Sequence, residues 1–341
     1  LFQTVAAQAS PDSNLFISPL SVSFALGMAW NGAEGNTETQ MRNLLGYGQM
    51  TEEEINSTYK SLISFLTTLD PQVRMDIANS AWPDLDFNIL ESFLERLSRY
   101  FSAEVNTLDL SRADAVSIIN SWVEENTNGK IKEILQDIPP DAVLYLINAL
   151  YFKADWTYQF DPEESFDTNF SLRDKSTVAC RMMQQKAEFD YLSAETFKAA
   201  VLPYGDGHFS MTVLLPKDGY DCSDIIDLFT AENWNQWMND VTTQEITLQM
   251  PKFSSEYKIE LSDVLKALGM TDAFSGSADF SRICTDKEIF ISRVLHKTFI
   301  EVDEEGTEAA AVTAVEYRET AVGPSLFLNK PFIYVIRDHH S

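Results

Sequence analysis

Residues 142–152 read AVLYLINALYF, a run in which almost every side chain is apolar. Such a run does not alternate between polar and apolar positions, so it is typical of a central strand in a sheet that is covered on both faces. The rest of the chain therefore has to supply a layer of structure on each side of this strand.

The part of the chain before this strand reads mainly as helices. Ser18 is a good N-cap and Pro19 a good first helical residue ahead of an apolar stretch. Thr51 with Glu54 three residues later predicts a capping box at the start of another helix. A third helix is expected to open at Ser111 and Asp114 and to stop at Asn128-Gly129, with Val116, Ile119, Trp122 and Val123 as its apolar face.

The part after this strand reads mainly as strands. Residues 201–204 and 209–215 predict a hairpin around a turn at residues 205–207. Helices first and strands later indicate an α+β protein. Further strands are predicted at residues 245–250, 289–291 and 298–302, and a late helix at residues 262–268.

Composition and charge exclude several classes of partner. The 25 basic and 52 acidic residues give a formal charge of 25 − 52 = −27, which argues against nucleic acid, heparin-like polyanions and anionic membranes. No apolar run approaches the roughly 20 residues of a membrane span. The length of 341 residues favours two domains, but no linker or repeat interrupts the chain. We therefore expect one domain over residues 1–341, and a monomer.

The chemistry-bearing residues do not predict an enzyme, a metal site or a cofactor. There are four histidines, and no metalloprotease, nucleophile-elbow or phosphate-loop motif is present. The cysteines Cys180, Cys222 and Cys284 are too few and too far apart for a disulfide scaffold or a zinc cluster. Asn56 and Asn169 each begin an N-glycosylation acceptor pattern, which is common by chance.

Residues 304–323, EEGTEAAAVTAVEYRETAVG, lie between a predicted strand and the run at 327–332. A loop this long is uncommon in a compact domain unless it is functional or disordered. Its residues nevertheless sort by parity, because from Thr307 to Arg318 all the charges fall on even positions. A period of two is the pattern of a half-buried strand, so the segment is able to be both a loop and a strand. The residues on odd positions are Thr307, Ala309, Ala311, Thr313, Val315 and Tyr317.

At this point the chain resembles a serpin. EEGTEAAA at 304–311 is similar to the hinge of the serpin reactive-centre loop, and NKPF at 329–332 is similar to the strand that follows it. The resemblance covers essentially the whole chain and implies a domain with three β-sheets, eight or nine helices and an exposed reactive-centre loop over about 304–324. The other matching signatures are FISPLS at 16–21, NGAEGNT at 31–37, NSWV at 120–123, TNGKI at 127–131 and NALYFK at 148–153.

The resemblance also implies roles for particular residues. The scissile bond would lie between Thr320 and Ala321, a spacing that agrees from Gly306 forward and from Asn329 back. Trp156 matches the tryptophan where loop insertion begins. Ser18, Ser21, Asn148 and His296 match the polar cluster beneath the two strands that part. The residues of the loop hinge are Glu304, Gly306, Thr307, Glu308, Ala309, Ala310, Ala311, Val312 and Thr313. Serpin hinges more often carry a small residue at the position of Val312, so we expect loop insertion to be mildly slowed.

The implied function is irreversible inhibition of a serine protease by a suicide-substrate mechanism. A small residue at Thr320 suits an elastase-like enzyme, whereas Arg318 or Tyr317 offers a cleavage site for trypsin- or chymotrypsin-like enzymes. Heparin is not expected to assist, because the stretch from Thr51 to Asp70 has Lys60 as its only basic residue. We expect Thr307 to be exposed with the loop before cleavage.

Two further expectations and one alternative remain. Compared with serpins the chain lacks part of the first helix and two late core strands, and we interpret this as trimming at both ends. We also expect the protein to be secreted. The alternative is a non-inhibitory serpin that acts as a carrier, chaperone or storage protein. Small residues from Thr307 to Ala311, with Glu308 as the one charge, favour the inhibitor.

Overall fold

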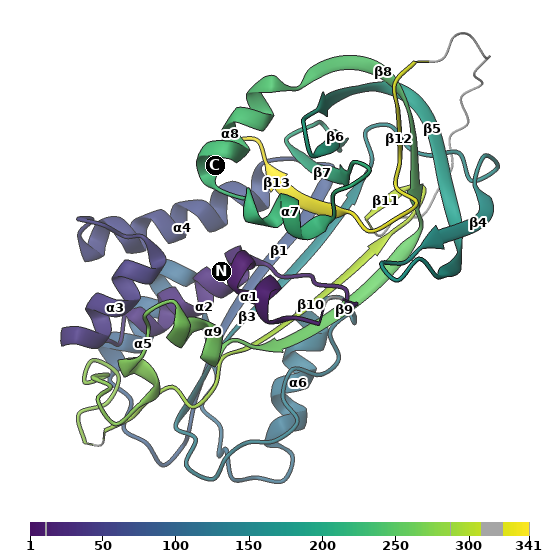
Figure 1. The fold of residues 1–341 in the computed structure, drawn as a ribbon. Helices are drawn as coiled ribbons and strands as arrows, with labels where there is room; N and C mark the ends of the chain where they lie inside the picture. Colours follow the sequence, from purple (N-terminus) through teal and green to yellow (C-terminus); the bar gives the residue numbers. More distant parts are fainter. Residues whose placement is uncertain (11, 287, 308–322, 341) are drawn as a thin grey trace.

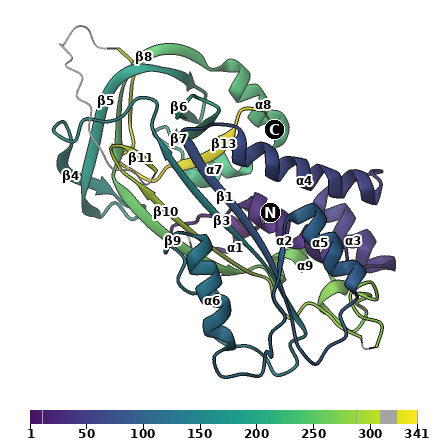
Figure 2. The same ribbon diagram turned by 180° about the vertical axis from the view of Figure 1, so that it is seen from behind.

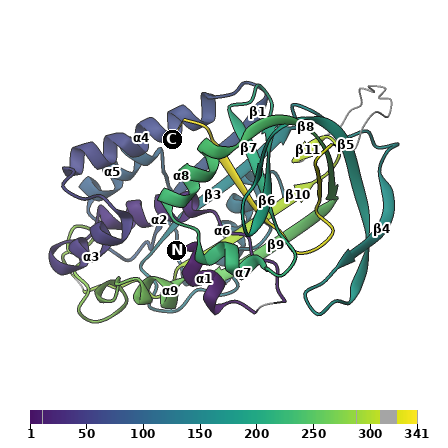
Figure 3. The same cartoon turned by 45° about the horizontal axis from the view of Figure 1, so that its top comes forward.

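The computed structural model describes residues 1–10, 12–286, 288–307 and 323–340. Within these residues there are nine α-helices and three β-sheets, so the predicted α+β class is confirmed. Helices α3, α4, α5 and α9 gather toward one end of the molecule, and the strands of the largest sheet lie at the other (Figure 1, Figure 3).

The apolar run forms the long strand β3 (Leu144–Asp155), as the sequence predicts. It pairs antiparallel with β1 (Val73–Pro83), which pairs in parallel with the short β2 (Glu104–Val105). On the other side of β3 lies β11 (Gly306–Thr307), so the order in this sheet is β11-β3-β1-β2.

Both faces of β3 are covered. Ile147 and Ala149 pack into one apolar cluster with Ile119 and Val123 of α6 (Ala115–Asn126). Side chains of the opposite parity pack into clusters shared with helix α2 (Pro19–Trp30) and with the largest sheet. Figure 2 shows α6 lying outside the long strands.

A second, two-stranded sheet runs beside β3. It consists of β9 (Phe253–Glu260) and β10 (Leu295–Val302), paired antiparallel. Figures 1 and 2 show β10 alongside β3, yet no backbone pairing joins these two strands in the described part of the chain. The sheets are therefore separate at this boundary.

The third sheet has seven strands in the order β12-β8-β5-β6-β7-β13, with β4 paired to β5 beside this path. The predicted hairpin is confirmed as β6 and β7, with Gly205 and Gly207 at positive φ in its turn. The strands are β4 (Phe166–Ser171), β5 (Thr177–Ser193), β6 (Phe197–Tyr204), β7 (Phe209–Pro216), β8 (Thr242–Pro251), β12 (Ser325–Phe327) and β13 (Ile333–Asp338).

Two of the predicted helix starts are confirmed together with their caps, and the third is confirmed in position only. Ser18 Oγ accepts from the Ser21 N–H at 3.2 Å at the start of α2. Thr51 and Glu54 form the expected capping box on α4 (Glu52–Thr68). At α6 the carboxylate of Asp114 binds Arg112 instead of capping the helix. The remaining helices are α1 (Phe2–Gln8), α3 (Gly35–Leu45), α5 (Glu91–Phe101), α7 (Cys222–Asp227), α8 (Ala231–Asp240), α9 (Ser262–Ala267) and the 3₁₀ turn Asp272–Phe274.

One predicted strand is wrong. Residues 289–291 form no strand. Ile289 and Ile291 instead pack against the cluster that holds α2 and α9, and the Ile291 N–H donates to the Ala273 carbonyl. The apolar character of this segment therefore reflects burial of an irregular stretch, which periodicity alone cannot distinguish from a short strand.

Candidate functional site

A slot separates β3 from β10. A cavity of about 70 Å³ lies in it, lined by Leu150, Tyr151 and Phe152 of β3 and by residues 297–301 of β10. The cavity wall also includes Ser18 and Ser21 on one side of the sheet and Thr127, Lys130 and Ile131 after α6 on the other. Its lining therefore reaches both faces of the sheet, and Thr307 of β11 closes one end of it.

Strand β11 is a two-residue strand that pairs with β3 at one end of this slot. Gly306 pairs with Asp155 and Thr307 with Ala154, antiparallel to β3, so the chain turns back along β3 after β10 ends. A Cβ on Gly306 would lie 2.1 Å from the Ala154 carbonyl oxygen, so only glycine fits this close approach. The segment that resembles a loop hinge thus begins as part of the sheet.

Thr307 is buried rather than exposed. Its side chain is 4% exposed, and its hydroxyl lies 2.7 Å from the hydroxyl of Tyr204, which is fully buried. Burial raises the pKa of Tyr204 well above its usual range, so the phenol stays neutral and keeps a hydrogen bond with Thr307. The expectation that Thr307 is exposed before cleavage is wrong, because pairing with β3 and contact with Tyr204 hold it in the sheet.

Glu304 anchors the chain just before β11. Its carboxylate binds Lys252 Nζ at 2.9 Å and accepts from the Ser165 hydroxyl at 2.9 Å. Its backbone carbonyl accepts from the Phe160 N–H. Burial raises the pKa of Glu304, but the bonds from Lys252 and Ser165 outweigh it, and the pKa is lowered overall. Glu304 is therefore a charged, buried anchor, and an exposed loop starts later than the predicted residue 304.

Trp156 holds the same junction from the end of β3. Its indole stacks on the ring of Tyr204 with centroids 4.4 Å apart and donates to the Asp303 carbonyl at 3.0 Å. Its backbone N–H donates to the Glu305 carbonyl at 2.8 Å. Trp156 thus fixes the turn from β10 into β11, where the resemblance puts the start of insertion.

The start of helix α2 bridges the two sides of the slot. The Ser18 N–H donates to His296 Nε2 of β10 at 3.0 Å. The Ser21 hydroxyl donates to Asn148 Oδ1 of β3, and Asn148 Nδ2 donates in turn to Asn79 Oδ1 of β1 at 2.9 Å. A few side-chain bonds, rather than a backbone ladder, therefore span the gap at this level.

His296 works here as an uncharged acceptor. Burial lowers its pKa to about 4, so Nε2 keeps the lone pair that receives the Ser18 N–H. Protonation would replace that acceptor with a second donor and break the bridge.

The structure brings together Glu304, Gly306, Thr307 and Trp156 at one end of the slot and Ser18, Ser21, Asn148 and His296 along it. The sequence did not single out Lys252, Ser165, Tyr204 or Asn79, because their partners are distant along the chain and no motif marks them. The predicted residues Glu308, Ala309, Ala310, Ala311, Val312, Thr313, Tyr317, Arg318, Thr320 and Ala321 lie outside the described residues.

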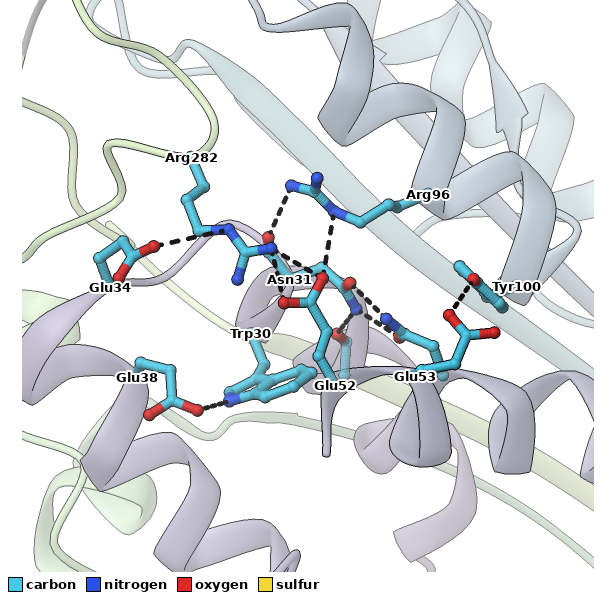
Figure 4. Close-up of polar contacts among 11 residues, drawn as sticks. Trp30, Asn31, Glu34, Glu38, Glu52, Glu53, Arg96, Tyr100 and Arg282 are labelled. Carbon is cyan, nitrogen blue, oxygen red and sulfur yellow. Dashed lines mark hydrogen bonds and ion pairs between the residues drawn. The ribbon is translucent and has the colours of Figure 1, made fainter. Parts of the chain in front are cut away.

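A second polar cluster lies among the helices (Figure 4). Arg282 binds both carboxylate oxygens of Glu52 at 2.7 and 2.8 Å, and Arg96 donates to the Asn31 carbonyl at 3.1 Å. Burial, with the charge of Arg282 beside it, lowers the pKa of Arg96. The Arg282 bonds tie the first turn of α4 to the segment after the 3₁₀ turn, and the Arg96 bond ties α5 to the end of α2, so the cluster has an internal, structural role.

The described residues contain neither a metal-binding cluster nor a membrane-spanning helix. No group of three or more histidine, cysteine, aspartate or glutamate side chains there is arranged to hold a metal ion. None of the helices described combines the length and apolar character needed to cross a bilayer.

The fold, with its slot between β3 and β10, defines a class of α+β proteins, and comparison with known proteins identifies that class. The family model "Serpin (serine protease inhibitor)" matches residues 1–341, so the chain belongs to the serpin family. Human neuroserpin is 36% identical over 97% of this chain and 84% of its own length. Bovine leukocyte elastase inhibitor is 36% identical over 99% of this chain and 92% of its own.

Solved structures agree. The thermophilic serpin tengpin in its native state superimposes with a TM-score of 0.88 at 33% identity, covering 98% of this chain and 88% of that one. Human thyroxine-binding globulin superimposes with a TM-score of 0.90 at 29% identity, covering 97% and 90%. The fold therefore occurs in relatives whose names denote an inhibitor and in one whose name denotes a carrier.

Proposed function

We propose that this serpin is an irreversible suicide-substrate inhibitor of a serine protease, cleaved between Thr320 and Ala321. The observation that carries the proposal is the pairing of β11 with β3 at one end of the slot between β3 and β10. Strand addition at such an edge gains backbone hydrogen bonds along its whole length. The sheet therefore offers a place for the segment after Thr307.

The register of β11 extends naturally into the slot. Thr307 faces Ala154, so each later loop residue would face one earlier residue of β3. Ala309 would then face Phe152 and Ala311 would face Leu150, two of the three β3 residues that line the cavity. Cross-strand partners share a face of the sheet.

The side chains of the segment suit this register. Phe152 and Leu150 pack on the side of the sheet that holds the Tyr204 cluster. The odd loop positions, which carry no charge up to Thr313, would enter that core. Glu308 would point to the other face, toward α6. Parity and register thus support insertion without burying a charge in the core.

In the proposed mechanism the protease attacks the loop as a substrate and forms an acyl-enzyme on the Thr320 carbonyl. Cleavage frees the segment from Glu308 to Thr320, which follows β11 into the slot and carries the bound protease along β3. Trapping requires insertion to outrun deacylation. The bridge from Ser18 and Ser21 to His296 and Asn148 has to rearrange as the slot widens, so it governs the rate of insertion.

The proposed target has a shallow apolar specificity pocket, as in elastase-like enzymes, because Thr320 is small and uncharged. Bovine leukocyte elastase inhibitor among the relatives supports that class. Cleavage after Arg318 by a trypsin-like enzyme, or after Tyr317 by a chymotrypsin-like enzyme, is the second candidate. We further propose that the chain is a single domain, monomeric and secreted, and that it inhibits without heparin.

The alternative is a non-inhibitory serpin, and thyroxine-binding globulin shows that the fold allows one. The test is incubation with an elastase-like protease, followed by a denaturing gel and mass spectrometry of the released peptide. A covalent band and a C-terminal peptide that starts at Ala321 are expected. A clean nick with active protease would indicate a substrate or carrier, and a peptide starting at Glu319 would assign the bait to Arg318.

A further inference from the structure

The two N-glycosylation acceptor patterns, at Asn56 and at Asn169, have different surroundings in the structure. Asn56, in the first turns of α4, is 1% exposed. Its Nδ2 donates to Asn31 Oδ1 and its Oδ1 accepts from Asn31 Nδ2, both at 2.9 Å. Because Nδ2 is the atom that would carry the glycan, a glycan at Asn56 is incompatible with this packed amide pair.

Asn169 has the opposite surroundings. It lies in β4, where the side chains of Asn169 and Ser171 are exposed and that of Phe170 between them is partly buried. The Phe170 ring lies 6.4 Å from that of Phe332, so the middle residue of the pattern points toward the protein. The alternation of a strand then directs the acceptor amide and the hydroxyl of Ser171 to the outer face.

The space around Asn169 is open. Its cross-strand partner on β5 is Ala179, a small and exposed residue. In the described residues β5 is the one strand that pairs with β4, and on the second edge the Ser171 N–H donates to the Asn329 carbonyl, so the part of this edge before Ser171 has no strand partner. An open edge of this kind invites pairing with another chain, and proteins commonly block it. A bulky, solvated glycan on the outer face of β4 would block it sterically.

We propose that Asn169 carries an N-linked glycan that shields the β4 edge and that Asn56 carries none. An oligosaccharide would pass from a lipid-pyrophosphate donor to Asn169. The anomeric carbon forms a bond to Nδ2 and breaks its bond to the pyrophosphate oxygen, while the amide loses one proton and the lipid pyrophosphate leaves. The proposal rests on the proposed secretion, and it is independent of protease trapping.

The test is expression of the chain through the secretory pathway of a eukaryotic cell, with glycopeptide mass spectrometry of the secreted protein. A glycan on Asn169 and none on Asn56 is expected. Asn169→Gln and Ser171→Ala should each abolish it, and Ser171→Thr should retain it. Thr58→Ala is the matched control, because Thr58 is exposed and its loss removes the Asn56 pattern without disturbing the buried amide pair.

An unmodified Asn169 in the folded, secreted protein, or a glycan on Asn56, would overturn the assignment. The shielding role is tested by heating the glycosylated protein beside Asn169→Gln and following light scattering. The variant should aggregate faster, and equal rates would overturn the role of the glycan at this edge. Protease trapping measured on the same samples is expected to be unchanged, so failure of the inhibitor proposal would be seen separately.

Discussion

Replacing Thr307 with arginine tests whether β11 starts the insertion. The native side chain is 4% exposed, and its hydroxyl is the partner of the buried Tyr204 phenol. Thr307→Arg leaves that phenol unpaired, at a cost of about 1–3 kcal/mol. It also requires a buried guanidinium with no designed partner, at an effective cost of several kcal/mol.

The protein can avoid the larger cost by letting β11 leave β3. The fold should then survive with an undocked hinge, and insertion after cleavage should slow because the first step along β3 is lost. About 1.4 kcal/mol on the insertion barrier changes the partition between trapping and deacylation tenfold. The variant should therefore be cleaved as a substrate and release active protease.

The assay is the stoichiometry of inhibition against an elastase-like protease, read with a denaturing gel. Thr307→Ser is the matched control, since it keeps the hydroxyl for Tyr204 and the small size, and it should trap as the parent does. Unchanged stoichiometry in Thr307→Arg, with the same yield of covalent complex, would refute insertion that begins at β11.

Three further predictions concern the anchor, the bridge and the helix α4. Lys252→Ala leaves the Glu304 carboxylate without its cation, and because the Lys252 side chain is 45% exposed we expect the free energy of unfolding to fall by about 1 kcal/mol, which calorimetry would record as a Tm lower by about 1–2 °C. Lys330→Ala is the control, because its partner Asp218 is fully exposed, and it should leave the Tm unchanged. Equal Tm shifts in the two variants would contradict the role of Glu304 as an anchor. Because the pKa of His296 is about 4 when folded and near 6.5 when unfolded, the unfolded chain binds the extra proton, so the free energy of unfolding should fall as the pH falls from 6.5 to 4, by up to about 1.4 kcal/mol per pH unit. Denaturant titrations at several pH values should show that the free energy of unfolding of His296→Gln depends less on pH than that of the parent protein. The same pH dependence in both proteins would contradict a neutral His296. Heparin should leave the rate of protease inhibition unchanged, because Lys60 is the one basic residue of α4. A marked increase in the measured inhibition rate on adding heparin would contradict this.

Much of the local structure could be predicted from the sequence because its causes are local. The capping box at Thr51, the N-cap at Ser18 and the hairpin around residues 205–207 depend on neighbours within a few positions. The apolar composition of residues 142–152 was enough to predict that the strand they form, β3, is buried. The false strand at 289–291 shows the limit of that signal, since an irregular buried segment is equally apolar.

The site could be predicted only where a motif marked it. The resemblance to serpins singled out Ser18, Asn148, His296 and Trp156. It did not give the register of the strands, so it could not predict which of these side chains contact each other. Tyr204 was missed because the sequence makes it an ordinary hairpin residue, and its role follows from the hydroxyl of Thr307 reaching it across the sheet. Lys252 and Asn79 were missed for the same reason, since each acts through a partner more than fifty positions away in the sequence.

Hydrogen exchange before and after loop cleavage tests strand insertion most directly. In the intact protein no strand pairing joins β3 to β10 among the described residues, so the slot-side amides of these strands beyond the β11 pairing should exchange faster than the β1 amides that bond to β3. After cleavage between Thr320 and Ala321, the inserted segment should pair with them and slow their exchange, with β1 unchanged as the internal reference. Unchanged exchange on the slot side of β3 and β10 in the cleaved protein would contradict insertion at this site.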